Sequence, residues 1–419
     1  MRVAIVDGYS GGVHLVRELL RRGVECVHVA SHERPGRYYT RSFRPGDYVA
    51  DLGYDAGVGA VAARLRGHGV ARVLAGAESG VNLADRLAYL TATPGNTLAR
   101  TGARRDKHEM AVALRAAGLS APRCAAVTTA AQAVAWFEAQ DDEEVVVKPL
   151  ASVTSDRVRF CRSAGDVRAA CAAVLDHPNV LGFPNAGALV EEVLAGAEYY
   201  VNTVSVGGIH VIAETWRYTK RRTPDGAPVF DFEEPIDPHS PEAGQIHEYC
   251  RAALTALGVR EGAGHLEVML TPRGPVLIDP GARLGGGVDP AVTERFLGYS
   301  HASLLAESVV NPERIAALAR PLPAGWPRPI RYVSLINLAE GVVRDLSWLD
   351  RITALPTVLS ATPAVMPGEV LPRTRDLLSS PGFVYLSADE PRAVEADYEQ
   401  IRRWEDACPY SSPTAFTST

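Results

Sequence analysis

The stretch from Gly264 to Gly287 constrains the fold of this chain more than any other. Residues 265–270 and 275–279 are strand-like runs, and Pro272-Arg273-Gly274 between them offers a glycine where a loop needs a positive φ. This pattern predicts a β-hairpin closed by a three-residue loop.

The hairpin predicts a pair of facing carboxylates. A three-residue loop places Glu267 opposite Asp279. The same register places Met269 opposite Leu277, and a bulge at Gly274 would move it by one residue. Facing carboxylates with Cβ atoms about 5 Å apart repel each other, so we expect a cation between them. Oxygen ligands suit Mg²⁺, which usually binds one or two protein carboxylates and fills its shell with water and substrate phosphates.

The end of the hairpin also carries features of a ligand site. Period-2 alternation places His265 on the same face as Glu267. Arg283 follows, and the glycines at 285–287 let a ligand approach the backbone closely. A solvent-facing hairpin with ordinary surface acids is the alternative, which we disfavour because of the arginine and the glycines.

Lysine is rare in this chain. Among its 43 basic residues only Lys107, Lys148 and Lys220 are lysines, and the rest are arginines. A lysine ammonium is a compact point charge on a flexible stem, which suits a phosphate group. We therefore expect the lysines in binding sites.

The composition excludes several classes of protein. With 419 residues, 47% hydrophobic and 22% charged, the chain fits a soluble globular protein of about two to four structural units. A net charge of −6 gives no reason to expect nucleic acid or an anionic membrane as a partner. We find no signal peptide, no run of transmembrane length and no cysteine spacing typical of zinc sites or disulfide frameworks. We therefore expect a cytoplasmic protein with reduced thiols.

Residues 1–100 predict a Rossmann-like N-terminal domain. A strand at 2–6 leads into a glycine-rich turn at 7–12. A helical pattern at 13–22 and a second strand at 24–30 complete a β-loop-α-β unit. The turn lacks the spaced glycines of a dinucleotide fingerprint, so we interpret it as a tight structural turn rather than a ligand site.

Residues 101–310 predict a second domain with a lid subdomain at about 120–190. Lys107 lies in the first turn of a helix, where the helix dipole favours anions, and a bound phosphate would explain a cation there. Lys148 ends an apolar strand and is followed by a loop rich in hydroxyl groups at 151–157.

The remaining pattern predicts a hairpin of strands 199–206 and 209–217. It also predicts a helix that starts after a Ser240 cap, with Pro241 at its first position, and runs to Gly258. After a proline-rich connector, residues 320–405 predict a C-terminal β/α subdomain. We expect residues 409–419 to be a disordered tail.

Lys107, Lys148, the run from Glu191 to Glu198 and the hairpin motif occur together in one order and spacing. Taken together they resemble the ATP-grasp superfamily of carboxylate–amine ligases. The segment from Ala75 to Asp106 resembles the branch of amino-acid ligases that make dipeptides. The resemblance implies an α/β (α+β) ATP-grasp fold with a Rossmann-like N-terminal domain, an ATP-binding lid subdomain, a central metal- and ATP-binding subdomain and a C-terminal extension.

The resemblance also implies that ATP is bound by Lys107, Lys148, Ser155, Glu191, Glu192, Leu194 and Glu198. Within this set the two lysines would contact the phosphates. Glu191 would lie near the exocyclic amine of adenine, with the backbone of Glu192 and Leu194 as acceptor and donor. Glu198 would bind the ribose hydroxyls.

At the reaction centre the resemblance implies that Glu267 and Asp279 hold one or two Mg²⁺ ions, with Mn²⁺ as an alternative metal. Arg283 and His265 would face the acyl phosphate as catalytic groups.

Three further residues are weaker substrate candidates. Lys220 could hold a substrate carboxylate, although we favour a charge run on a mobile loop. Gly286 and Gly287 leave side-chain space near the acyl site, which predicts a substrate larger than alanine.

These features predict an ATP- and Mg²⁺-dependent ligase that joins amino acids or amino-acid-like metabolites through an acyl phosphate in small-molecule biosynthesis. We expect a homodimer. The alternatives are an ATP-grasp carboxylase, a ligase that modifies a peptide, and a non-catalytic nucleotide-binding regulatory protein. The last is motivated by the loop 151–157, which has few glycines for closing over phosphates.

Overall fold

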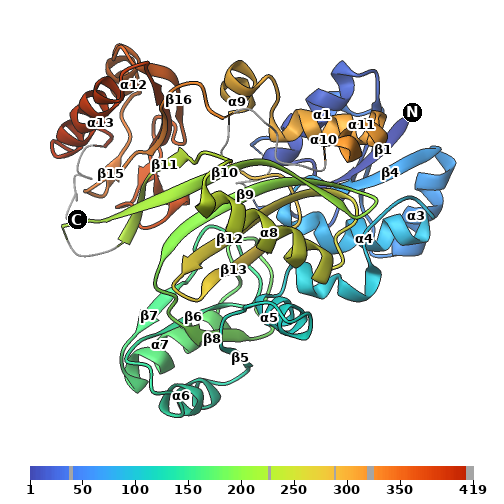
Figure 1. The fold of residues 1–419 in the computed structure, drawn as a ribbon, viewed down its shortest axis with the longest axis horizontal. Coiled ribbons are helices and arrows are strands. Elements are labelled where there is room, and N and C mark those ends of the chain that lie inside the picture. Colours follow the sequence, from blue (N-terminus) through green and yellow to red (C-terminus); the bar gives the residue numbers. More distant parts are fainter. Residues whose placement is uncertain (37–40, 225–227, 287–288, 319–324, 412–419) are drawn as a thin grey trace, which may run out of the picture. The chain divides into compact units, whose positions relative to one another are not determined.

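The computed structural model describes residues 1–36, 41–224, 228–286, 289–318 and 325–411 (Figure 1). The chain divides into two compact units. The first unit comprises Met1–Thr215, Pro238–Glu294 and Gly298–Pro323, and the second comprises Trp216–Asp237, Arg295–Leu297 and Ala324–Thr419. We describe each unit by itself.

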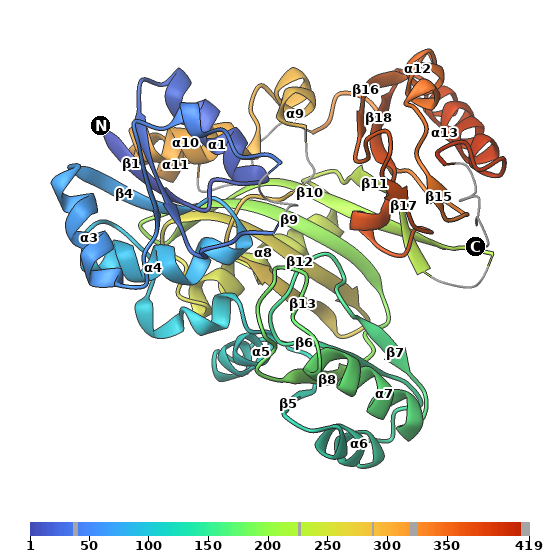
Figure 2. The ribbon, with the colours of Figure 1, turned by 180° about the vertical axis from the view of Figure 1, so that it is seen from behind.

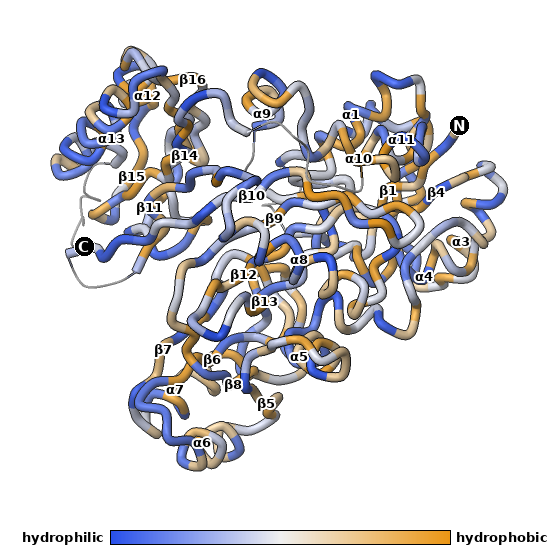
Figure 3. The backbone as a smooth tube through the Cα atoms, viewed as in Figure 1, coloured by the Kyte–Doolittle hydropathy of each residue, from blue (hydrophilic) through white to orange (hydrophobic). Residues whose placement is uncertain are grey.

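A parallel sheet in the order β3-β2-β1-β4 opens the first unit. Its strands are β1 (Arg2–Val6), β2 (Glu25–Ala30), β3 (Ala50–Tyr54) and β4 (Val70–Ala75). Helix α1 (Gly11–Arg21) joins β1 to β2, α3 (Val58–Gly67) joins β3 to β4, and α4 (Val81–Leu90) follows β4. Apolar side chains of β1 and β2 are buried on both faces, as expected for a parallel sheet covered by helices, and β1 is largely hydrophobic in Figure 3.

The turn between β1 and α1 packs closely against the end of β4. A Cβ atom at Gly12 would lie 2.7 Å from the Cα of Gly76, so only glycine fits there. This close approach supports the interpretation of residues 7–12 as a tight structural turn.

The lid region forms a second, antiparallel sheet in the order β5-β8-β6-β7. Its strands are β5 (Cys124–Val127), β6 (Val145–Pro149), β7 (Arg159–Cys161) and β8 (Ala188–Glu192). Helices α6 (Ala130–Glu138) and α7 (Ala164–Leu175) pack against it through a core that includes Val134, Val145, Val167 and Val190 (Figure 1).

The central sheet of the first unit has the order β13-β12-β9-β10. Its strands are β9 (Ala197–Val206), β10 (Ile209–Arg222), β12 (Gly262–Thr271) and β13 (Gly274–Gly281). Helix α8 (Pro241–Ala256) packs on β12 and β13, and its start is capped by Ser240 as predicted. Helix α5 (Lys107–Ala116), whose cap is Asp106, also contacts β13.

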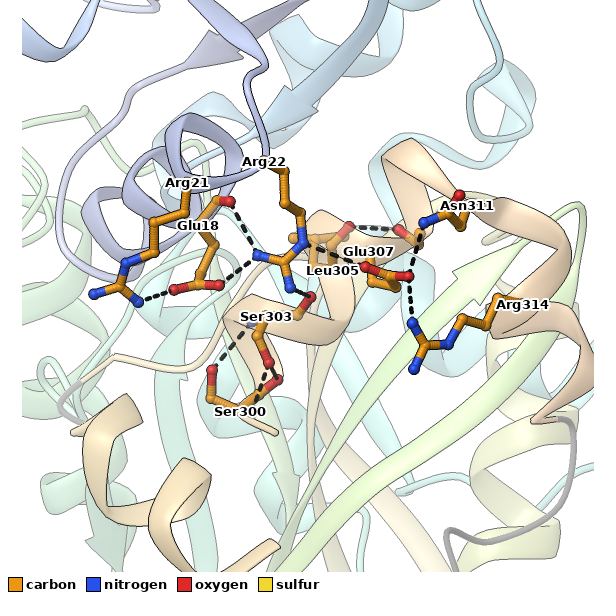
Figure 4. Close-up of polar contacts among 10 residues, drawn as sticks. Glu18, Arg21, Arg22, Ser300, Ser303, Leu305, Glu307, Asn311 and Arg314 are labelled. Atoms are coloured by element: carbon orange, nitrogen blue, oxygen red, sulfur yellow. Dashed lines mark hydrogen bonds and ion pairs between the residues drawn. The ribbon is translucent and has the colours of Figure 1, made fainter. Parts of the chain in front are cut away.

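Helices α9 (Pro290–Leu297), α10 (His301–Val310) and α11 (Pro312–Ala317) follow this sheet. An ion-pair network joins α10 to α1 (Figure 4). The Arg22 guanidinium lies 2.5 Å from Glu18 and 3.3 Å from Glu307, and it donates to the carbonyl of Ser303. Arg314 pairs with the other oxygen of Glu307 at 3.0 Å. These contacts hold α10 against the end of α1. Helix α10 also packs on β9, where His301 contacts the backbone of Thr203.

The β12–β13 hairpin confirms the facing carboxylates and corrects part of the register. Glu267 lies opposite Asp279 as predicted. The turn is one residue shorter than predicted, because Gly274 already pairs with Thr271 at φ 98°. Met269 therefore faces Val276 rather than Leu277. A bulge between Glu267 and Val268 restores the predicted pairing at the carboxylates.

The strands of the second unit pair in the order β10-β11-β14-β18-β16. They are the distal half of β10 together with β11 (Pro228–Pro235), β14 (Ile330–Ser334), β16 (Val358–Pro363) and β18 (Gly382–Ser387). Strands β15 (Gly341–Val342) and β17 (Val370–Leu371) form a separate pair. Figure 2 shows α12 (Ser347–Thr353) and α13 (Pro391–Glu405) beside β16 and β18.

Two features of the second unit differ from the prediction. Strand β10 continues to Arg222 instead of ending at Arg217, because residues 216–222 pair with β11. Tyr410, which the sequence placed in a disordered tail, is 2% exposed, and its hydroxyl donates to Glu405. Its ring packs edge-on against Trp348, a contact that no local pattern reveals.

Candidate active site

The facing carboxylates of the hairpin lie beside a cation. The Lys107 ammonium is 3.1 Å from an oxygen of Asp279, which lies opposite Glu267. Among the described residues no group of three or more His, Cys, Asp and Glu side chains is arranged to hold a metal ion. A divalent ion bound by these two carboxylates would take its other ligands from water and phosphate, which is the usual arrangement for Mg²⁺.

The fold brings Lys107 next to the segment that follows Lys148. The backbone N–H of Lys107 donates to the carbonyl of Leu150 at 3.0 Å, just beyond the strand that carries Lys148. The Lys148 ammonium is buried and lies 2.5 Å from a carboxylate oxygen of Glu191. Burial works to lower the pKa of Lys148, but Glu191, Asp279 and Glu267 together raise it. Lys148 is therefore charged and lies in the field of the facing carboxylates.

The paired acids of β8 point in opposite directions, as strand alternation requires. Glu191 pairs with Lys148, whereas the Glu192 carboxylate contacts Arg123 at 3.1 Å and Arg273 at 2.8 Å. Burial works to raise the pKa of Glu192, but hydrogen bonds from the Arg123 backbone and from Arg273 lower it. Arg273 belongs to the turn of the β12–β13 hairpin, so this ion pair ties the lid sheet to the central sheet.

Leu194 and Glu198 continue the same stretch of chain. Leu194 is half-buried in the connection between β8 and β9. Glu198 is half-buried on β9 and lies opposite Met269 of β12. Both residues therefore follow Glu191 closely in the chain, Leu194 between β8 and β9 and Glu198 near the start of β9.

The loop after Lys148 has a glycine-like backbone without glycines. Thr154, Ser155 and Arg157 adopt φ angles of 58°, 59° and 49° in the left-handed region, which side chains usually disfavour. Asp156, which the sequence analysis missed, holds this loop, since its carboxylate accepts from the Ser152 hydroxyl at 2.7 Å and from the Val180 N–H at 2.9 Å. The shortage of glycines noted in the sequence is thus accommodated by strained residues held by hydrogen bonds.

Arg283 is held by a residue that the sequence analysis did not single out. Its Nε lies 2.8 Å from Glu78, at the carboxyl end of β4, and Arg105 lies 2.9 Å from the other oxygen of the same carboxylate. An acidic residue three positions after the end of a parallel strand is a usable signal, because ligands bind at the carboxyl ends of such strands.

His265 is buried in a polar chain. Asn202 donates from its amide nitrogen to Glu214 at 2.8 Å, and its oxygen lies 2.8 Å from Nδ1 of His265. The His265 Nδ1–H is therefore the donor in this pair, and Nε2 carries the lone pair. Burial, with Arg283 and His301, holds the pKa of His265 well below its usual value, so the ring is neutral.

His301 on α10 is a second buried histidine at this place. Its Nε2 donates to the carbonyl of Thr203 at 2.9 Å, and burial lowers its pKa to about 4. Nothing in the local sequence around His301 indicates this contact, which depends on the packing of α10 against β9.

The glycines after β13 differ from one another in their surroundings. A Cβ at Gly285 would lie 2.9 Å from Nδ1 of His265, so the backbone there packs directly on the imidazole. A Cβ at Gly286 would lie 3.4 Å from the Ser10 hydroxyl, which brings the turn after β1 next to this segment. Gly287 lies outside the described residues.

Lys220 belongs to the second unit. It lies on β10, in a strand rather than in the mobile loop that the sequence suggested, and its ammonium stands 4.8 Å from the ring centroid of Phe230.

No helix in the described part of the chain combines the length and the apolar character needed to cross a membrane. The cysteines that the structure describes are unpaired thiols.

Comparison with known proteins identifies relatives over the whole chain, although no protein-family model matches it. The chain is 30% identical over 413 residues to dapdiamide A synthase of Enterobacter agglomerans, a match that covers 96% of this chain and 95% of that protein. It is 26% identical over 294 residues to the uncharacterized protein y4rH of Sinorhizobium fredii, covering 68% of this chain and 56% of that protein.

Two solved structures share the fold. An L-amino acid ligase from Bacillus licheniformis superposes with a TM-score of 0.71 at 18% identity, covering 96% of this chain and 97% of that chain. A carboxyaminoimidazole ribonucleotide synthase from Aspergillus clavatus, complexed with ATP, superposes with a TM-score of 0.70 at 15% identity, covering 97% and 98%. The predicted fold class is thereby confirmed. Solved structures of this fold hold ATP, as in the Aspergillus clavatus synthase, or the magnesium salt of ADP, as in the biotin carboxylase domain of the Hydrogenobacter thermophilus 2-oxoglutarate carboxylase. On its sequence and its fold, this chain belongs to the ATP-grasp superfamily of carboxylate–amine ligases and is an ATP-dependent enzyme that forms amide bonds.

Proposed function

We propose that this enzyme joins the carboxylate of one amino acid or amino-acid-like metabolite to the amine of another, in the synthesis of a small peptide-like product. One observation carries the proposal: Glu267 faces Asp279, Lys107 pairs with Asp279, and Lys148 lies in the field of both acids, in a chain related along its whole length to dapdiamide A synthase. We also propose the cytoplasm as its location, because the reaction consumes ATP.

The phosphates of ATP would be held by Lys107 and Lys148, whose present partners are carboxylates. An arriving phosphate would take the place of a carboxylate oxygen at each ammonium, which suits the compact charge of lysine. Glu267 and Asp279 would hold one or two Mg²⁺ ions, or Mn²⁺, whose charge offsets that of the phosphates.

The nucleoside would lie along the connection from β8 to β9. Glu191 would approach the exocyclic amine of adenine, with the backbone of Glu192 and Leu194 as its further hydrogen-bonding groups. Glu198 would accept from the ribose hydroxyls, and the hydroxyl of Ser155 would donate to phosphate.

The chemistry follows from these placements. A substrate carboxylate oxygen attacks the γ-phosphorus, the bond to the β,γ-bridging oxygen breaks, and ADP leaves. The amine nitrogen of the second substrate then attacks the carbonyl carbon, the C–N bond forms, the nitrogen loses one proton to water, and phosphate leaves with the electrons of the C–O bond. Arg283 would bind the acyl phosphate through its planar fork, and neutral His265 would lie beside it.

The substrate preference follows from the glycine segment. Gly286 offers no side chain at the end of the hairpin, and Gly287, outside the described residues, extends this in the sequence. We propose an acyl substrate larger than alanine. A strict preference for glycine or alanine would contradict this.

The test is phosphate release from ATP and Mg²⁺ with a panel of amino acids, singly and in pairs. We expect release that requires a pair, an amide product of matching mass, and loss of both in Glu267→Gln. The matched control is Glu261→Gln. Glu261 directly precedes β12, the strand that carries Glu267, and its carboxylate pairs with Arg72 at 3.3 Å. Release with bicarbonate and no amino acid would refute the proposal.

A further inference from the structure

Glu78 is a buried carboxylate at the carboxyl end of β4. It lies in a short 3-10 turn (Glu78–Gly80) and is 7% exposed. A buried carboxylate needs charged or hydrogen-bonding partners to offset its lost hydration. Its backbone position is fixed as well, since a Cβ at Gly80 would lie 2.6 Å from the carbonyl oxygen of Val6.

The partners of Glu78 are two arginines from distant parts of the chain. Arg283 approaches one carboxylate oxygen through Nε at 2.8 Å. Arg105 approaches the other oxygen through Nη1 at 2.9 Å and also donates to the Glu78 backbone carbonyl. Each oxygen thus has its own arginine, and the carboxylate cannot rotate without breaking both pairs.

Arg283 is fixed in orientation by this arrangement. Besides the contact of Nε with Glu78, its Nη1 donates to the carbonyl of Leu284 at 2.9 Å. A planar group held at two of its nitrogens has a fixed plane. A Cβ at Gly281 would lie 3.5 Å from the Arg283 Cζ, so the guanidinium lies over the end of β13, the strand that carries Asp279.

We propose that Glu78 is a positioning residue that holds the Arg283 guanidinium in the orientation needed at the acyl phosphate. This inference rests on the proposed function, in which Arg283 binds the intermediate. Without the Glu78 charge, Arg283 would be repelled by Arg105 and attracted by the carboxylates of the hairpin. Arg283 would then leave the orientation in which it meets the acyl phosphate.

A purely structural role is the competing explanation, since the pair also ties β4 to the segment after β13. The chain offers a matched control for it. Arg72 of β4 pairs with Glu261, just before β12, at 3.3 Å, so Glu261→Gln removes an ion pair between the same two sheets without touching Arg283.

The experiment compares Glu78→Gln with Glu261→Gln in the amino-acid-pair assay, after the wild-type enzyme has shown pair-dependent phosphate release. For Glu78→Gln we expect kcat to fall about 100-fold with KM for ATP within twofold of wild type, because the group that binds the intermediate is misplaced while the nucleotide site is intact. For Glu261→Gln we expect both constants within twofold. In the background of Arg283→Lys, adding Glu78→Gln should cause no further loss, since the two residues act as one unit.

The outcomes distinguish a failure of the proposed function from a failure of the proposed role of Glu78. A wild-type enzyme without pair-dependent release overturns the proposed function and this inference with it. An active wild type together with a Glu78→Gln variant of unchanged kcat, or with losses that multiply in the double variant, overturns the inference alone. Should Glu78→Gln lose its cooperative thermal transition, Glu78→Asp, which keeps the charge one methylene shorter, must still lower kcat at constant KM for ATP.

Discussion

Because Lys148 is paired with Glu191, we expect Lys148→Met to lower both the folding stability and the affinity for ATP. Both side chains are about nine-tenths buried and their charged atoms are 2.5 Å apart. In the free enzyme the substitution leaves the Glu191 carboxylate without its cation. In the presence of ATP it also removes a proposed phosphate ligand.

The two effects have different magnitudes. Breaking a buried ion pair by removing one partner costs about 3–5 kcal/mol of folding free energy, because the remaining charge is buried and uncompensated. A charge-assisted hydrogen bond contributes about 1.5–3 kcal/mol, so ATP should bind roughly 10- to 150-fold more weakly. Adding Glu191→Gln removes the uncompensated charge and should recover most of the lost stability without restoring ATP affinity.

The assay combines thermal unfolding, followed by circular dichroism, with titration calorimetry of ATP. Lys220→Met is the matched control, since Lys220 is the remaining lysine of the chain, is exposed, and lies over Phe230 in the second unit. We expect that control to match wild type in both measurements. ATP affinity in Lys148→Met equal to that of wild type would refute the assignment of this lysine to the phosphates.

Three further predictions test other parts of the site and fold. Asp279→Asn should raise the Mg²⁺ concentration for half-maximal activity by about tenfold or more, and an unchanged metal dependence would remove this residue from the proposed metal site. Gly285→Ala should cost about 1–3 kcal/mol and lower kcat, because its Cβ would lie 2.9 Å from Nδ1 of His265, whereas Gly59→Ala, with open space around it, should be neutral or stabilising in thermal melts. Burial lowers the pKa of His247 from 6.5 to about 4, so the unfolded chain takes up a proton at higher pH than the native protein does. Stability should therefore decline as pH falls from 6.5 to 4, by up to about 3 kcal/mol from this residue, and the slope of unfolding free energy against pH in that window should be smaller in His247→Gln.

The sequence by itself determined the elements whose pattern is local. The hairpin followed from alternation and a glycine turn, and the rarity of lysine drew attention to Lys107 and Lys148. The Ser240 cap and Pro241 gave the start of α8, because capping depends on neighbours in the chain. Such features are predictable, since their physical causes lie within a few residues.

Only the tertiary structure decided which distant side chains meet. Arg283 contacts Glu78 across 205 positions of the chain, and His265 contacts Asn202 across 63, and neither partner is implied by the residues around it. The bulge after Glu267 had no local signal either, although it restores the register on which the facing carboxylates depend. These contacts arise because packing of the parallel sheet, the central sheet and α10 fixes side chains that the chain order leaves far apart, and burial then requires each charge to find its partner.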